Sequence, residues 1–298
     1  MKTTGRPRRP SWSKPRLLIV GCGDVGSRIV SRARSRFRIF AVTASGSRAA
    51  ALREQGAVPL AANLDRRETL ARLAGLAPYV VHLAPPPPTG TRDARTARLV
   101  AALAPRATGA RAFVYVSTTG VYGDRGGARI DETATPAPAT ARAQRRVDAE
   151  RRLRRGPWHA TVLRAPGIYA GDRLPLERLS QRIPVARHDE DVYTNHIHAD
   201  DLARLCLAAL FRGRRGRVYH AADDSELKVG DFLDQVADAR GLPRPPRVSR
   251  AELRAAVSPV MWTFLSESRR LSNRRLRREL RFVLRYPTVG EALQRPAM

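Results

Sequence analysis

The stretch GCGDVG contains three glycines whose spacing is typical of a turn that binds phosphate groups. It follows a short apolar run and precedes a stretch with helical periodicity, which is the context that the pattern G-x-G-x-x-G requires. One glycine permits the tight turn, one lets the backbone approach a pyrophosphate, and one lets helix and strand pack closely. The helix N-terminus also presents free N–H groups to phosphates. Unless the stretch is only a tight turn in an unrelated α/β protein, the residues that contact a dinucleotide are Gly21, Gly23, Asp24, Val25 and Gly26.

The identity of the dinucleotide depends on the segment about 20 residues further on, where NAD-specific sites carry an acid that binds the ribose 2′-hydroxyl. The segment RIFAVTASGSR, residues 38–48, contains no Asp or Glu. It offers Ser45, Ser47 and Arg48 instead, and hydroxyl and guanidinium groups suit a 2′-phosphate. We therefore expect NADP(H) in preference to NAD(H). The alternative is that Arg48 is a solvated surface residue.

These residues need a sheet to position them, and strand-like apolar runs alternate with helical patterns from Arg16 onward. Strands are predicted over 16–20, 38–45, 57–64, 79–85, 112–118, 159–166 and 217–223, and helices over 24–33, 47–56, 66–75, about 93–103, 200–211 and 228–241. Such alternation predicts an α/β protein with a Rossmann-type doubly wound parallel sheet.

A run of four prolines begins at Pro85, directly after a predicted strand. Proline has no N–H to donate, so the run cannot continue a ladder and must form a stiff loop. Open α/β sheets bind ligands at the carboxyl ends of their strands. We therefore expect Leu83, Ala84 and Pro85 beside the cofactor.

The chain of 298 residues is long enough for one large domain or two smaller ones. Residues 1–15 combine Pro, Ser and cations with almost nothing apolar, which predicts a disordered basic arm. We predict a dinucleotide-binding domain over 16–166 and about 192–222, and a smaller substrate domain over about 167–191 and 223–298. Within the latter, residues 266–282 predict an amphipathic helix or helix pair whose cationic face is solvated or binds an anionic substrate or nucleic acid.

Arginine dominates the charge of the chain. There are 55 basic and 27 acidic residues, a formal net charge of +28, and the only lysines are Lys2, Lys14 and Lys228. The excess reflects either a compositional bias or a polyanionic partner. Because arginine is scattered over most segments, nucleic-acid binding is the weaker alternative as a main function. Weak non-specific binding at low salt is expected in either case.

The two cysteines, Cys22 and Cys206, are far apart in the sequence and predict reduced thiols in a cytoplasmic protein. No apolar run approaches the roughly 20 residues that a membrane span needs. The sequence shows no signal-peptide pattern, and we expect no metal site.

Several motifs occur in the order found in the extended short-chain dehydrogenase/reductases, the NAD(P)-dependent epimerase/dehydratase group. They are VGCGDVG, VVHLAP, YVSTTGVYGD with DET shortly after, LRAPGIYAGD and NHIHADDLARLCLAAL. The chain resembles this family from about Arg16 to Leu293, and STTGVYG and NHIHADDLA are its most specific pieces. The glycine turn is shorter than the family's usual G-x-x-G-x-x-G and is similar to that of an atypical branch. The resemblance implies an NAD(P) cofactor, with Pro166 of LRAP beside it.

The family's catalytic set is a Ser or Thr that orients the substrate oxygen, a Tyr that exchanges a proton, and a Lys four residues later. The resemblance places Thr118 at the Ser/Thr position, with Ser117 beside it. If Glu150 is the acid that commonly follows the Lys, Arg146 takes the Lys position and Arg142 the Tyr position. A guanidinium does not deprotonate in a protein, so Arg142 cannot exchange the proton. Arg146 remains able to hold the ribose or a phosphate.

A substitute proton donor must come from elsewhere, because no Tyr lies between positions 122 and 169 and no Lys between 14 and 228. The candidates are Tyr122, Tyr169, His82, His196 and His198. Each can also be a packed aromatic or a hydrogen-bonded histidine with no role in chemistry. Among them we assign Tyr122 to the catalytic site.

Three functions follow from these patterns. The first is an NAD(P)-dependent oxidoreductase or epimerase-like enzyme with an altered catalytic set. The second is a cofactor-binding sensor or interaction protein without turnover, and the third is a nucleic-acid-associated basic protein. For the enzyme we expect a small-molecule substrate of anionic or sugar-nucleotide type, no membrane partner, and a homodimer as an option.

Overall fold

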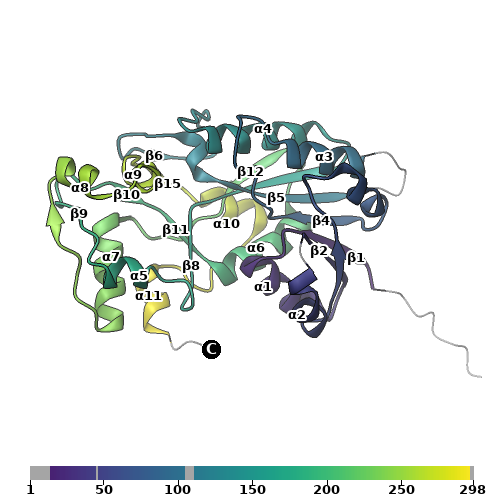
Figure 1. Cartoon of the computed structure of the whole chain (residues 1–298), viewed down its shortest axis with the longest axis horizontal. Coiled ribbons are helices and arrows are strands. Elements are labelled where there is room, and N and C mark those ends of the chain that lie inside the picture. The colour runs from purple at the N-terminus through teal and green to yellow at the C-terminus, as the bar shows by residue number, and fades with distance from the viewer. Residues whose placement is uncertain (1–13, 45, 105–110, 296–298) are drawn as a thin grey trace, which may run out of the picture.

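The computed structural model describes residues 14–44, 46–104 and 111–295. Ser45 and nearly all of the expected basic arm lie outside these residues. The central sheet contains seven parallel strands, which are β1 (Arg16–Val20), β2 (Arg38–Thr43), β3 (Ala57–Ala61), β4 (Tyr79–His82), β5 (Ala112–Thr118), β7 (His159–Ala165) and β12 (Arg217–His220). Their order is β12-β7-β5-β4-β1-β2-β3 (Figure 1). The chain runs outward from β1 in one direction and then from β4 in the other, which confirms the doubly wound Rossmann-type fold.

Helices cover both faces of this sheet. One face packs against α1 (Asp24–Ala33), α6 (Ala199–Arg212) and α10 (Arg274–Leu280). The other packs against α3 (Ala94–Leu103) and α4 (Ala141–Arg155), with a 3-10 helix over Arg67–Leu73 where an α-helix was predicted. The remaining helices are α2 (Ala49–Glu54), α5 (Leu176–Ser180), α7 (Val229–Arg240), α8 (Arg250–Ala256), α9 (Pro259–Leu265) and α11 (Val289–Gln294), with shorter 3-10 turns over Gly46–Arg48 and Thr119–Tyr122.

The central strands are mainly apolar, as expected for strands whose two faces are both covered. In β1, Leu17 to Val20 are fully buried, and Val20 pairs with Val42 of β2 and His82 of β4. This register aligns the carboxyl ends of the central strands along one edge of the sheet. The segments that follow those ends begin at Gly21, Leu83, Thr119 and Pro166, so residues far apart in the sequence meet there.

A second group of elements lies beyond that edge, to the left in Figure 1. It contains α5, α7, α8 and α9 around its own apolar core, which includes Val185, Leu233, Leu253 and Leu265. The chain also contains four short two-stranded pairs: β6 (Arg129–Ile130) with β15 (Arg270–Leu271), β8 (Gly167–Tyr169) with β11 (His196–His198), β9 (Val185–Ala186) with β14 (Arg247–Val248), and β10 (Tyr193–Thr194) with β13 (Leu227–Lys228). The pair of β9 and β14 lies within the second group. A separate core is what the proposed division into two domains requires.

The C-terminal arginine segment is not one continuous helix. It contains the short strand β15 and then the seven residues of α10. Leu276 and Leu280 of α10 are fully buried in the core beside the main sheet, although the sequence-based division assigned them to the smaller domain. Among the described residues, no helix is long and apolar enough to span a membrane.

Candidate functional site

A cleft lies at the carboxyl edge of the sheet and consists of two adjoining hollows that share Thr118 and Pro166. We call the first the glycine-turn half and the second the Arg142 half. The glycine-turn half brings together ten of the residues predicted from the sequence: Gly21, Gly23, Asp24, Val25, Gly26, Leu83, Ser117, Thr118, Arg146 and Pro166. Val116, Ala165, Ile168, Arg173 and Leu202 complete its lining and were not predicted.

The three glycines of the turn have different surroundings. Gly21 has φ +88°, and a Cβ there would lie 2.4 Å from the backbone nitrogen of Ala84, which itself donates to the carbonyl of Val20. A Cβ at Gly26 would lie 3.0 Å from Cys22 Sγ, at the contact between helix and strand. A Cβ at Gly23 would meet nothing within 4 Å. The fold itself therefore requires glycine at position 21 and leaves little room for a Cβ at Gly26, whereas Gly23 leaves open space in the cleft.

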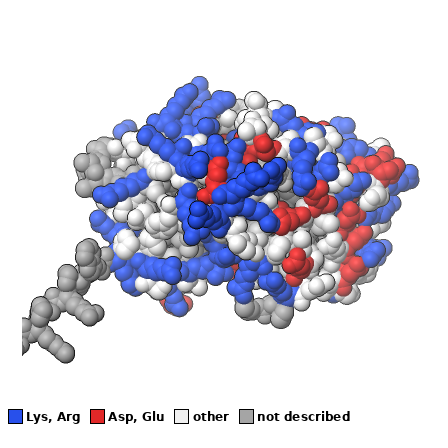
Figure 2. Space-filling model, turned by 180° about the vertical axis from the view of Figure 1, so that it is seen from behind, with Lys and Arg blue, Asp and Glu red and all other residues white. Residues whose placement is uncertain are grey.

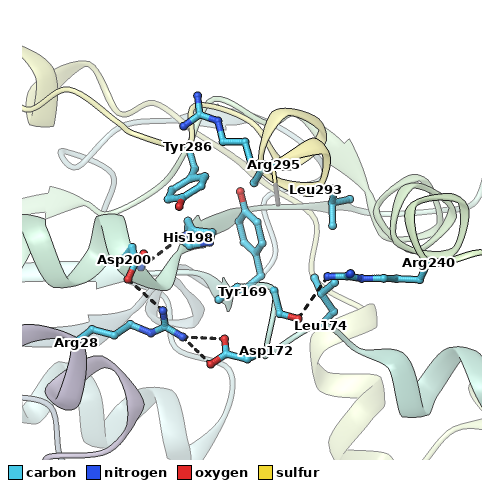
Figure 3. Close-up of a pocket in the computed structure, with 13 residues that line it drawn as sticks. Arg28, Tyr169, Asp172, Leu174, His198, Asp200, Arg240, Tyr286, Leu293 and Arg295 are labelled. Atoms are coloured by element: carbon cyan, nitrogen blue, oxygen red, sulfur yellow. Dashed lines mark hydrogen bonds and ion pairs between the residues drawn. The ribbon is translucent and has the colours of Figure 1, made fainter. Parts of the chain in front are cut away.

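Asp24 begins α1 and is held by two arginines. Arg28 Nε contacts its Oδ1 at 3.0 Å, and Arg173 Nη1 contacts its Oδ2 at 2.8 Å. The same Arg28 reaches Asp172 at 2.7 Å and Asp200 at 3.1 Å (Figure 3). This network connects the glycine turn to the loop after β8, and it places Arg173 in the lining of the glycine-turn half.

The end of β5 supplies hydroxyl groups to the cleft. Thr118 Oγ1 accepts a hydrogen bond of 3.2 Å from the N–H of Gly120, so its own proton remains available to donate. Ser117 is buried, and its Oγ has no hydrogen-bond partner among the described residues. Arg146 reaches the same strand from α4, donating to the Tyr115 hydroxyl at 3.0 Å and to the Val116 carbonyl at 3.1 Å. A hydroxyl and a cation therefore lie together at the floor of the cleft.

The Arg142 half is assembled from side chains of remote segments. Arg142 lies at the start of α4, with its guanidinium carbon 4.2 Å from the centre of the Phe264 ring. Arg269 forms an ion pair of 2.8 Å with Glu267. Tyr193 of β10 also lines this half. Nothing in the local sequence around Tyr193 and Phe264 indicates that they meet Thr118. Glu267 and Arg269 lie in residues 266–282, the segment whose cationic face was predicted to be solvated or to bind an anionic substrate or nucleic acid.

The structure places Tyr122 outside the cleft. It is fully buried, and its hydroxyl lies 2.5 Å from Nε2 of His220. Burial raises the pKa of Tyr122, and neither hollow includes it in its lining. Because a buried phenol bonded to a histidine cannot reach a substrate, we do not retain Tyr122 as a catalytic residue.

The other candidate proton donors also lie elsewhere. His82 bonds to Thr96 Oγ1 at 2.9 Å, and burial lowers the pKa of His82 and of His196 to about 3. Tyr169 and His198 line a separate pocket beside Arg28, drawn in Figure 3, where the His198 ring stacks on Tyr286 with centroids 3.7 Å apart. None of the four lines either half of the cleft.

Three predicted cofactor contacts border the glycine-turn half without lining it. Ala84 packs against Gly21, and Pro85 follows in the stiff loop. Arg48 is exposed and lies close enough to the turn for its charge to influence the pKa of the Cys22 thiol. Burial raises the pKa of the Cys22 thiol to about 11, and the Arg48 guanidinium acts in the opposite direction.

Comparisons with known proteins identify a family and solved structures with the same fold. A family model for NAD(P)H-binding proteins matches residues 21–212. A solved structure of a protein of unknown function from Silicibacter pomeroyi is 29% identical, with a TM-score of 0.80 over 94% of this chain and 97% of that one. No curated protein sequence matches the chain.

Two solved epimerases share the fold at lower identity. A UDP-glucose 4-epimerase from Thermotoga maritima, solved with UDP-glucose, is 18% identical, with a TM-score of 0.74 over 94% of this chain and 96% of that one. A UDP-glucuronic acid 4-epimerase from Bacillus cereus, solved with NAD, is 15% identical, with a TM-score of 0.73 and the same coverage.

Proposed function

This chain belongs to the NAD(P)H-binding family, and from that premise we propose that it is an oxidoreductase or epimerase-like enzyme that prefers NADP(H). The observation that carries the proposal is the cleft itself. Gly23 leaves room for a pyrophosphate at the start of α1, and Thr118 and Arg146 lie in the same hollow. A cofactor that fits this hollow would bring its nicotinamide to the point where the two halves meet.

The preference for NADP(H) rests on the residues beside the turn. No acid is present in residues 38–48 to bind a ribose 2′-hydroxyl, whereas Arg48 is exposed near Cys22. A guanidinium binds phosphate oxygens through paired N–H groups. We therefore assign Arg48 to the 2′-phosphate.

When bound, the cofactor would supply hydride-transfer chemistry, and the Arg142 half would hold the substrate. The Thr118 hydroxyl would donate to the substrate oxygen, and Arg146 would hold the nicotinamide ribose. Arg142 cannot exchange the proton, because its guanidinium stays charged. We assign the proton exchange to Tyr193, which lines the Arg142 half together with Thr118.

The absence of the family's Tyr and Lys favours a second candidate, a cofactor-binding protein without turnover. The charge of +28 favours a third, a nucleic-acid-associated protein. Figure 2 shows Lys and Arg spread over much of one face of the molecule, with Asp and Glu mainly toward its right side. Scattered charge of this kind suits weak phosphate contacts rather than a defined groove.

The test begins with calorimetric titrations of the purified protein with NADPH and with NADH. We expect NADPH to bind more tightly, and failure of both to bind would overturn the first two candidates. Turnover is then measured with panels of carbonyl compounds and sugar nucleotides.

Thr118→Val and Tyr193→Phe should each lower turnover strongly, while Thr118→Ser should retain most of it. Tyr193→Phe should leave cofactor affinity unchanged, because Tyr193 does not line the glycine-turn half. Cofactor binding with no turnover on any substrate would favour the second candidate. A duplex affinity that falls steeply with salt would indicate only non-specific phosphate contacts.

A further inference from the structure

Arg142 is exposed, and it is the arginine of the Arg142 half that forms no ion pair within the part of the chain that the structure describes. Among the described residues, the ion pairs within 4.0 Å include Arg269 with Glu267 but none that involves Arg142. Its guanidinium lies over the Phe264 ring, 4.2 Å from the ring centre. An arginine stacked on an aromatic face keeps the N–H groups at its edge available for hydrogen bonds.

The surroundings of Arg142 make an anionic ligand favourable. Partial burial and the neighbouring Arg146 lower the pKa of the Arg142 guanidinium, and the nearby Glu267 acts in the opposite direction. Glu267 is already engaged by Arg269, so the half contains two arginines and one carboxylate. Arg146 adds a third cation at the floor of the adjoining half. An incoming anion would relieve this repulsion between cations.

The position of Arg142 determines where on the substrate the anion must lie. Arg142 lines the same hollow as Thr118, which the proposed function places against the reacting oxygen. It comes from the first turn of α4, one helical turn before Arg146. An anion held there would therefore be close to the reacting carbon rather than at a distant end of the substrate.

We propose that the Arg142 half binds a small organic acid through a carboxylate that pairs with Arg142, next to the carbon that reacts. The inference rests on the proposed function for the role of Thr118, but the anion site stands on the geometry of Arg142, Phe264 and Glu267. The hollow has a volume of about 210 Å³. This is below the roughly 300–1,000 Å³ of pockets that bury drug-sized ligands, which suits a compact acid better than a complete sugar nucleotide.

The test uses calorimetric titration of the full-length protein with oxalate, inorganic phosphate and UDP, each with and without saturating NADP⁺. We expect oxalate to bind in both conditions. Arg142→Met should weaken oxalate binding by at least about tenfold, because a charge-assisted hydrogen bond is lost. Arg142→Lys should restore part of the affinity, since it keeps the charge but not the paired N–H geometry.

Arg154→Met is the matched control, because Arg154 is exposed on the same helix and does not line the cleft. It should leave oxalate binding unchanged, and circular dichroism establishes that each variant is folded. Equal oxalate affinity in the wild type and in a folded Arg142→Met variant would overturn the proposal. Tight binding of UDP without binding of oxalate would overturn it as well. NADPH titration of the wild type and of the same variants separates the two inferences. If the proposed function is wrong, the wild type itself will not bind NADPH, whatever its affinity for oxalate.

Discussion

The two halves of the cleft are built in different ways. The glycine-turn half is shaped mainly by backbone, in a continuous segment of six residues and at the ends of neighbouring strands. The Arg142 half is shaped by side chains from segments around residues 118, 142, 193 and 264. The first half contains the glycine turn that was predicted to hold a dinucleotide. The second contains Arg142, which the family resemblance would align with the proton-exchanging Tyr. The fold by itself therefore does not establish the chemistry of the second half.

Substitutions in the glycine turn should have the largest effects, on cofactor affinity or on stability, because backbone atoms shape this half of the cleft. Gly23→Ala should leave the free energy of unfolding nearly unchanged, because a Cβ there meets nothing within 4 Å. It should weaken NADPH binding roughly a hundredfold, because the methyl group occupies the space that the pyrophosphate needs. Calorimetric titration measures the affinity and urea unfolding the stability.

Gly21→Ala provides the contrast. At φ +88° and 2.4 Å from a backbone nitrogen, the new Cβ should destabilise the fold by about 3 kcal/mol or more. Gly290→Ala is a suitable control, since a Cβ at that helical position lies no closer than 3.6 Å to a neighbour. If Gly23→Ala binds NADPH as the wild type does, the pyrophosphate does not approach this turn.

The next effect concerns Arg146, which lines the glycine-turn half. The family resemblance would align it with the Lys if Glu150 is the acid that follows. Arg146→Met should weaken NADPH and NADH binding to a similar extent, about tenfold, because the contact to the ribose is common to both cofactors. Arg146→Lys should recover part of the loss. The same titrations on Arg154→Met give the baseline. Unchanged affinity in Arg146→Met would mean that Arg146 only supports Tyr115 and the end of β5.

The contrast between the halves also explains what could be predicted from the sequence. The apolar runs and the glycine turn are local patterns, so the fold and the NAD(P) cofactor class were predicted and are confirmed. Phe264 and Arg269 reach the cleft only through tertiary folding, and no local spacing indicates it. Tyr122 was misplaced because its motif does not reveal which way the turn after β5 points, and in the structure its hydroxyl meets His220.

An effect limited to one of the two cofactors is expected at Arg48, at the outer edge of the glycine-turn half. Arg48→Gln should weaken NADPH binding by about tenfold, because one charge-assisted contact to the 2′-phosphate is lost. NADH carries no such phosphate, so its affinity should not change. The ratio of the two dissociation constants is the quantity to measure. An equal loss for both cofactors would place Arg48 against a part of the dinucleotide that they share.

The smallest effect concerns the support behind the Arg142 half and appears in the pH dependence of stability. The backbone N–H of Asp223 donates to the carbonyl of His196 at 2.8 Å, and His196 is the first residue of β11. Tyr193 and Asn195, which line the Arg142 half, come just before β11 in the chain. Burial raises the pKa of Asp223 to about 8, so the folded protein keeps this carboxyl protonated well above pH 4. The unfolded chain loses the proton near pH 4, and the contribution of Asp223 to stability therefore falls as the pH rises from about 4 to about 8.

Asp223→Asn has no proton to lose, so its stability should lack this decline. Relative to the wild type, the free energy of unfolding of the variant should increase by at least about 1 kcal/mol between pH 5 and pH 8. Urea unfolding of both proteins at several pH values measures this difference in the free energy of unfolding. The buried histidines titrate in both proteins, so their contribution cancels in the difference. Cofactor affinity should remain unchanged, because Asp223 lines neither half of the cleft. A pH-independent difference would show that Asp223 is already ionised in the folded protein. A loss of NADPH binding would show instead that the two halves are coupled through β11.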